Sequence, residues 1–112
     1  MGAKTDVLNG TLDLIVLKTL AAMGPLHGYA IARRIEQVSD DQLQINQGTL
    51  YPALVKLHQR GWITAKWGAS STGRRVKVYE LTRRGTEQLL NEEADWKRSA
   101  GIVTKFFRLQ RN

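Results

Sequence analysis

The sequence predicts a mainly α-helical protein with a small β-hairpin, an α+β chain, and three observations support this. A segment that begins near Asn46 has apolar residues at helical spacing on one face: Leu50, Ala53, Leu54 and Leu57. Two short alternating segments, 62–67 and 76–81, then flank a Gly- and Ser-rich stretch. From Leu89 on, an apolar residue recurs at every third or fourth position, with one interruption at Glu93. This order of elements is the outline of a winged helix-turn-helix followed by a long C-terminal dimerisation helix.

Length and composition limit the classes of protein. With 112 residues, 42% of them hydrophobic and 24% charged, the chain is an average globular domain. We expect a winged helix-turn-helix part at 1–82 and a C-terminal helix at 83–112. No run is apolar enough to span a membrane and no signal-peptide pattern is present, so we expect a cytoplasmic protein without membrane contacts. The absence of cysteine excludes disulfides and thiolate sites, and we expect no metal and no cofactor.

The first predicted helix follows a loose lead-in at 1–9. Thr11 is the expected N-cap, with an acidic residue in the first turn. The segment after it is apolar nearly all round and must therefore be buried on more than one side. Gly24 and Pro25 end this helix, because glycine accepts a left-handed conformation and proline cannot continue a helix.

A second helix is predicted over about 28–38. His27 stands at its start, where a capping or packing role is far more common for histidine than a catalytic one. The segment 43–45 is predicted to be a short strand that pairs with the later hairpin. The residues of the second helix that should face the core are Ile31, Ala32, Ile35 and Val38.

The third helix carries the residues of greatest functional interest. If Gly48 or Thr49 caps it, Pro52 falls within the first turn, where proline does little harm. Tyr51 then lies near the N-terminal end, which in helix-turn-helix proteins points at base edges. Packing of Tyr51 against the second helix is the alternative interpretation. Gly61 is expected to end the helix and to lead into the wing.

The positive charge is concentrated in the third helix and the hairpin. Eight basic residues and one acidic residue lie between Lys56 and Arg84, which gives this segment a charge of +7. The whole chain also has a net charge of +7, so the remainder is neutral. A local cationic patch on a helix and a hairpin predicts a surface that binds phosphates. The Gly- and Ser-rich stretch 68–73 is expected to be a mobile tip beside Arg74 and Arg75 that can contact a DNA backbone or reach into a minor groove.

The final helix, from a cap at Thr82 to about Leu109, has two apolar lines. Such a helix cannot bury both lines against one compact domain, so we expect it to pair with a second copy of the chain. Gly101 lies within it and weakens it by up to ~1 kcal/mol relative to alanine. One line is a heptad seam broken by one acid: Leu89, Glu93, Trp96, Ala100, Val103 and Phe107.

Several stretches together resemble the PadR-like transcriptional regulators, in particular their short branch. They are Gly10-Thr11-Leu12-Asp13-Leu14, Gly24-Pro25-Leu26-His27-Gly28-Tyr29, Gln47-Gly48-Thr49-Leu50-Tyr51-Pro52-Ala53-Leu54, and the wing residues Arg74, Arg75, Lys77 and Tyr79-Glu80-Leu81-Thr82 with Gly85. The resemblance implies a homodimer that binds a palindromic operator in double-stranded DNA and represses transcription. It also implies that an effector relieves this repression. It also implies base contacts by Gln47, Thr49 and Tyr51, and phosphate contacts by Lys56, Arg74, Arg75 and Lys77.

The resemblance further implies a pocket for a planar aromatic small molecule at the dimer interface. Trp96 stands where the family uses a tryptophan, and Leu89, Ala100, Val103 and Phe107 extend along the same line. Simple packing of Trp96 in the dimer seam is an equally good interpretation.

Two other functions compete with DNA binding. Many small basic proteins bind RNA, but the outer face of the third helix lacks the interleaved aromatic residues that stack on unpaired bases. Competition between duplex DNA and single-stranded RNA separates these two hypotheses. An enzyme is disfavoured, because the sequence has no nucleophile–base pair, no metal-ligand spacing and no phosphate-binding glycine loop.

Overall fold

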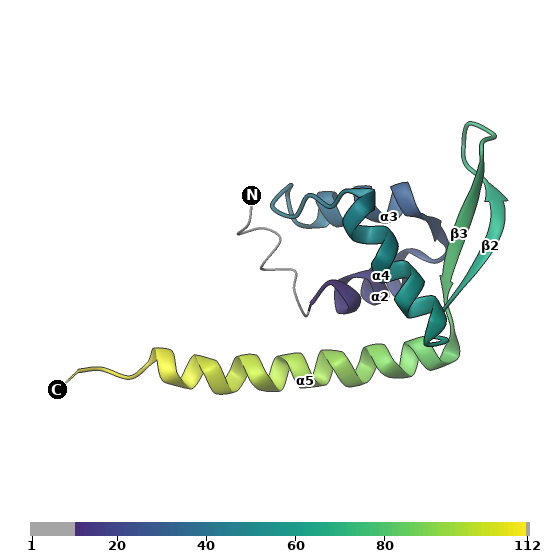
Figure 1. Cartoon of the computed structure of the whole chain (residues 1–112). Coiled ribbons are helices and arrows are strands. Elements are labelled where there is room, and N and C mark those ends of the chain that lie inside the picture. The colour runs from purple at the N-terminus through teal and green to yellow at the C-terminus, as the bar shows by residue number, and fades with distance from the viewer. Residues whose placement is uncertain (1–10, 112) are drawn as a thin grey trace.

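The structure of the protein is a computed structural model that describes residues 11–111 (Figure 1). The predicted lead-in at 1–9 lies outside the described residues. Within the described part, four helices and one three-stranded antiparallel sheet form the predicted winged helix with a long last helix. The elements are α2 (Leu12–Met23), β1 (Leu26–His27), α3 (Gly28–Val38), α4 (Gln47–Gln59), β2 (Ile63–Ala69), β3 (Arg75–Leu81) and α5 (Arg83–Phe107).

Helix α2 is the centre of the fold, as its apolar sequence predicts. Val16, Leu17 and Leu20 are buried, and α2 contacts α3, α4, β3 and α5. Thr11 occupies the N-cap position as predicted, although its side chain makes no capping hydrogen bond. Gly24 ends the helix with a φ of 80°, as expected for a residue without a Cβ.

Helix α3 begins with the predicted histidine cap. His27 Nδ1 accepts a hydrogen bond from the backbone N–H of Ala30, at 3.2 Å. Ile31, Ala32 and Ile35 are buried as predicted, whereas Val38 is 69% exposed. Val38 is the last residue of α3 and lies at the rim of an apolar groove between α2 and α3, so its predicted place in the core is wrong.

The sheet has the order β1-β3-β2, with β3 in the middle. The third strand is formed by Leu26–His27, which pair with Tyr79 and Val78, and not by 43–45 as the sequence predicted. The turn at Gly24 returns the chain alongside β3 and places β1 on its free edge. The segment 43–45 contributes instead to the core, where Ile45 is buried without strand pairing.

The ends of α4 and the start of α5 are fixed by hydrogen bonds. Asn46, and neither Gly48 nor Thr49, caps α4: its Oδ1 accepts from the N–H of Thr49 at 2.9 Å. Pro52 consequently lies in the second turn of α4, not in the first. At the other end, Gly61 has a φ of 79°, and the N–H groups of Gly61 and Trp62 donate to the carbonyls of His58 and Leu57. This is a Schellman motif, as the glycine predicted.

Helix α5 begins at the predicted cap, since Thr82 Oγ1 accepts from the N–H of Gly85 at 3.0 Å. The same hydroxyl donates to the carbonyl of Gly61 at 2.7 Å, which ties the start of α5 to the end of α4. Helix α5 then passes beneath α2, and its C-terminal part extends beyond the rest of the domain (Figure 1). No helix in the described residues is both long and apolar enough to cross a membrane.

Candidate nucleic-acid interface

A groove of about 680 Å³ lies between the N-terminal ends of α3 and α4 and the wing, which is formed by β2, β3 and their connecting loop. Gln47 and Tyr51 line it from α4, and Arg74, Arg75 and Lys77 line it from the wing. These are five of the seven residues that the sequence assigned to DNA contact. The folded chain therefore brings the exposed end of α4 and the cations of the hairpin to one surface.

The remaining two residues lie elsewhere on α4. Thr49 is exposed but does not line the groove. Lys56 is near the C-terminal end of α4, where its Nζ lies 2.8 Å from Asp13 Oδ2 in the first turn of α2. Asp13 thus neutralises a cation that the sequence assigned to a phosphate. Of the eight cations between 56 and 84, Lys56 is the one that pairs with a carboxylate in the described part of the chain.

Burial of one face of α4 in the core determines which of its side chains are exposed on the other face. Leu50, Ala53, Leu54 and Leu57 are buried as predicted. Tyr51 lies on the opposite side and is 57% exposed at the groove. Its neighbour across the groove is Tyr79, which is 7% exposed. Burial raises the pKa of the Tyr79 phenol above its ordinary value, and the nearby Tyr51 raises this pKa further.

The loop of the wing is shorter than the sequence predicted. Gly68 and Ala69 belong to β2, so residues 70–74 form the tip. Hydrogen bonds close this loop: the N–H of Ser70 donates to the carbonyl of Arg74, and the N–H of Gly73 donates to the carbonyl of Ser70. Gly73 has a φ of 82°, which explains a glycine at this turn.

Two exposed aromatic residues of the groove were not assigned to the site from the sequence. Tyr29 is exposed at the start of α3, with its ring 6.5 Å from that of His27. Trp67 is 59% exposed on β2, opposite Lys77 of β3. The signal for Trp67 was its position next to Lys66 in an alternating strand, but only the register of the hairpin shows which cations face it.

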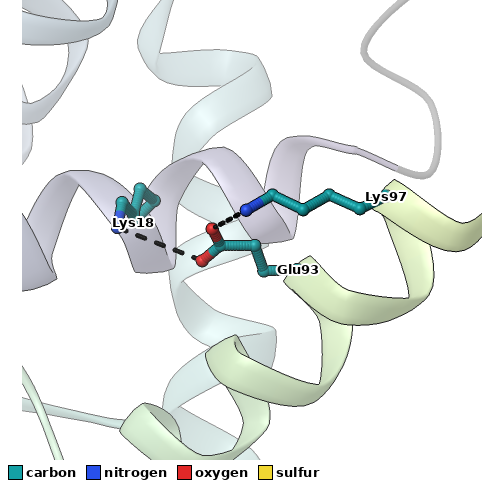
Figure 2. A network of polar contacts seen from close by, with 3 residues as sticks. All are labelled: Lys18, Glu93 and Lys97. Carbon is teal, nitrogen blue, oxygen red and sulfur yellow. Dashed lines mark ion pairs between the residues drawn. The ribbon is translucent and has the colours of Figure 1, made fainter. Parts of the chain in front are cut away.

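The predicted seam of α5 is divided by the fold. Leu89 is buried in the core of its own chain, whereas Trp96, Val103 and Phe107 are largely exposed and Ala100 is half-buried. The acid that interrupts the seam, Glu93, lies between two cations: its carboxylate is 4.0 Å from Lys18 Nζ on α2 and 3.0 Å from Lys97 Nζ on α5 (Figure 2). The acid that breaks the seam therefore makes an ionic contact within α5 and a longer one to α2.

A second concave surface lies on the α2 side of the molecule. It has a volume of about 450 Å³ and lies between α2 and α3, with Glu93 of α5 at its edge. Its walls are mainly apolar: Leu14, Ile15, Ala22, Met23 and Val38. No group of three or more potential metal ligands occurs within residues 11–111.

Comparisons with known proteins agree with this geometry. The sequence model of the Transcriptional regulator PadR-like family matches residues 16–91. An uncharacterised protein X of Lysinibacillus sphaericus is 28% identical over 103 residues, which cover 92% of this chain and 94% of that protein.

Two solved structures are similar along almost the whole chain. A transcriptional regulator from Clostridium thermocellum has a TM-score of 0.81 and 29% identity, with 90% of this chain and 97% of that chain covered. A PadR family transcriptional regulator from Eggerthella lenta has a TM-score of 0.79 and 27% identity, with 95% of this chain and 89% of that chain covered.

Proposed function

The chain belongs to the PadR-like family of transcriptional regulators, and we propose on this premise that it is a homodimeric repressor of a palindromic operator in double-stranded DNA. A transcriptional regulator of this family is not an enzyme. The observation that carries the proposal is the groove in which Gln47 and Tyr51 face the cations of the wing. A duplex needs both parts, because base edges give specificity and phosphate contacts give affinity and position.

Each part of the groove has its own role in this proposal. The N-terminal half of α4 enters the major groove, where Gln47, Thr49 and Tyr51 contact base edges. Arg74, Arg75 and Lys77 hold the backbone beside it. Lys56 also contacts a phosphate, and it must exchange the carboxylate of Asp13 for that phosphate.

The exposed part of α5 supports pairing with a second copy. Beyond the buried Leu89, seven large apolar residues of the C-terminal segment are 48–81% exposed: Leu90, Trp96, Ile102, Val103, Phe106, Phe107 and Leu109. So many exposed apolar side chains on one helix are typical of an interface between chains. In this proposal residues 1–82 are the DNA-binding part and 83–112 are the dimerisation part, which contains α5. The first turns of α5 also belong to the core, through Leu89.

Relief of repression by a planar aromatic molecule completes the proposal. Trp96 is 54% exposed and lies on the same line of α5 as Val103 and Phe107. When two copies pair along this line, the indole is available to stack on a flat ligand. A ligand that binds between the two helices would change the distance between the two copies of α4 and thus the fit to the operator.

Selection of bound fragments from genomic DNA, followed by their sequencing, tests the function. We expect an inverted repeat whose half-sites are about one helical turn, ~34 Å, apart or a multiple of it. The operator duplex should compete for the protein far better than single-stranded RNA of the same sequence. Recovery of no common sequence, or stronger competition by the RNA, would contradict the proposal.

The mass of the protein in solution tests the homodimer. We expect light scattering to give twice the 12.6 kDa of one chain. Phe107→Glu should shift the mass to that of a monomer, because Phe107 is 81% exposed on α5 and contributes nothing to the core. Asn91→Glu is the matched control, because it places the same acid on an exposed polar site of α5. A monomeric wild-type protein would contradict this part of the proposal.

A further inference from the structure

The wing contains an exposed tryptophan that has two cations over one ring. Arg75 Cζ lies 4.2 Å from the centroid of the Trp67 ring, and Lys77 Nζ lies 5.3 Å from it. We call Trp67, Arg75 and Lys77 the wing cation–π cluster. Its geometry follows from the hairpin, because Trp67 is directly opposite Lys77 and Arg75 is two residues before Lys77 on the same strand. Residues two apart on a strand share one face of the sheet.

The ring has no structural role in the core that would explain its position. Trp67 is 59% exposed, and its neighbours in the strand, Lys66 and Gly68, are not core residues either. Its contacts with the two cations are therefore the interactions that define its place. Two like charges on one face of a hairpin repel each other, and a shared aromatic face offsets part of this repulsion.

The arrangement leaves the cations able to bind an anion. A guanidinium stacks through its flat face and donates hydrogen bonds within its plane, so Arg75 can rest on Trp67 and still donate to a phosphate. An ammonium has three donors, and contact with the ring occupies only one side of it. A long cationic side chain that is not ordered in advance loses considerable rotamer freedom when it binds an anion.

We propose that Trp67 is a positioning residue for phosphate recognition: its indole orders Arg75 and Lys77 before DNA arrives, so that both engage the backbone of one strand at a lower entropic cost. The inference rests on the proposed DNA binding and deepens it, because it assigns a role to a fourth residue of the wing, Trp67, which need not touch the DNA. Arg74 provides the comparison. It is adjacent in sequence and lines the same groove, but no aromatic ring lies against it in the described part of the chain.

Binding of a random duplex over a series of salt concentrations tests the proposal. The affinity of Trp67→Leu should fall about fivefold, in keeping with ~0.5–1 kcal/mol for each exposed cation–π contact. The dependence of affinity on salt should stay unchanged, because both cations are still present. Arg75→Ala should instead lower the slope of log affinity against log salt concentration by about one. Trp67→Phe should recover most of the lost affinity, since it restores an aromatic face.

Double variants separate positioning from a general effect on the wing. The loss caused by Arg75→Ala should be smaller in a Trp67→Leu background than in the wild type, whereas the loss caused by Arg74→Ala should be the same in both. Ring-current shifts of the Arg75 and Lys77 side-chain protons, measured without DNA, should disappear in Trp67→Leu. Thermal melts confirm that each variant is folded.

Three outcomes overturn the inference. The first is an affinity of Trp67→Leu for the random duplex that equals that of the wild type. The second is a weaker dependence of its affinity on salt. The third is that the Trp67→Leu background changes the losses caused by Arg74→Ala and Arg75→Ala equally. In each of these cases the wild-type protein still binds duplex DNA, so the proposed function stands. If the wild type itself fails to bind the duplex, the proposed function fails and this inference fails with it.

Discussion

Lys56 Nζ lies 2.8 Å from Asp13 Oδ2, so an ion pair joins the C-terminal half of α4 to the first turn of α2. Both side chains remain partly exposed, with 46% of Lys56 and 22% of Asp13 accessible. The pair adds to the packing contact between α4 and α2, the helix at the centre of the fold. It also means that Lys56 is already neutralised when DNA approaches, which the sequence alone did not indicate.

Replacement of the carboxylate should make Lys56 a better phosphate ligand. We expect Asp13→Asn to raise the affinity for duplex DNA about two- to fivefold at low salt, because a partly exposed pair of this kind is worth up to ~1 kcal/mol. Stability should fall by about 0.5–1 kcal/mol, since the pair and a favourable charge in the first turn of α2 are both lost. Fluorescence anisotropy of labelled duplex and urea unfolding measure the two effects.

Asp95→Asn is the control for total charge, because it removes the same formal charge from an exposed site on α5. An equal gain of affinity in both variants would show that Lys56 has no special role.

Two glycines of α5 should respond to alanine with opposite signs. Gly85 is buried, and a Cβ there would overlap the backbone carbonyl oxygen of Trp62. The cost of overpacking, typically ~1–3 kcal/mol and more against rigid backbone, outweighs the ~1 kcal/mol that alanine gains in helix propensity. Gly85→Ala should therefore destabilise the protein by about 2 kcal/mol or more in urea unfolding.

Gly101→Ala is the matched substitution in the same helix. Nothing lies within 4 Å of the position of its Cβ, so alanine should stabilise the protein by about 0.5–1 kcal/mol. A loss of stability at Gly101 would show instead that another backbone, such as that of a second copy, lies against this position.

Elements with a local periodic pattern could be predicted from the sequence more fully than elements that depend on contacts between distant residues. The buried face of α4 was predicted residue by residue, because a 3.6-residue period fixes which positions point together. Strand β1 has two residues and pairs with β3 across about fifty positions of sequence, so it has no periodic signal of its own. The cap of α4 was placed two or three residues late, because several residues near Asn46 have the chemistry of a cap.

The wing cation–π cluster shows why the site was only partly predicted. The basic residues were evident, but their contact with Trp67 depends on the exact register of the hairpin. A change of one residue in register moves every side chain of a strand to the other face. The sequence did not define the ends of the loop to that precision, since Gly68 and Ala69 were assigned to the loop and lie in β2.

Tyr51 should contribute to the choice of sequence and little to general affinity. We expect Tyr51→Ala to lower the ratio of operator to random-duplex affinity about tenfold, because a good base contact is worth ~1–3 kcal/mol of discrimination. The affinity for random duplex should stay nearly constant. His58→Ala is the control, since His58 is exposed near the other end of the same helix and does not line the groove, so the ratio should stay unchanged. Equal losses on both duplexes would make Tyr51 a structural residue.

Glu93 gives the protein a pH-dependent contact between α2 and α5. The hydrogen bond from Lys97, the charge of Lys97 and then the charge of Lys18 lower the pKa of Glu93 below its ordinary value of 4.5 (Figure 2). A carboxyl group with a lowered pKa in the folded state stabilises the fold above its unfolded pKa. This contribution is lost as the pH falls through the folded pKa.

The stability of Glu93→Gln relative to the wild type should therefore depend on pH. We expect the variant to be less stable at neutral pH, and the difference to shrink as the pH falls through the folded pKa of Glu93, where the wild-type carboxyl becomes protonated as well. All other carboxyl groups titrate in both proteins, so the difference between two thermal melts isolates Glu93. Lys97→Met should reduce this pH-dependent difference more than Lys18→Met does, because Lys97 is the closer cation, at 3.0 Å against 4.0 Å. A difference that stays constant from neutral to acidic pH would mean that the side chain contributes through packing and not through its charge.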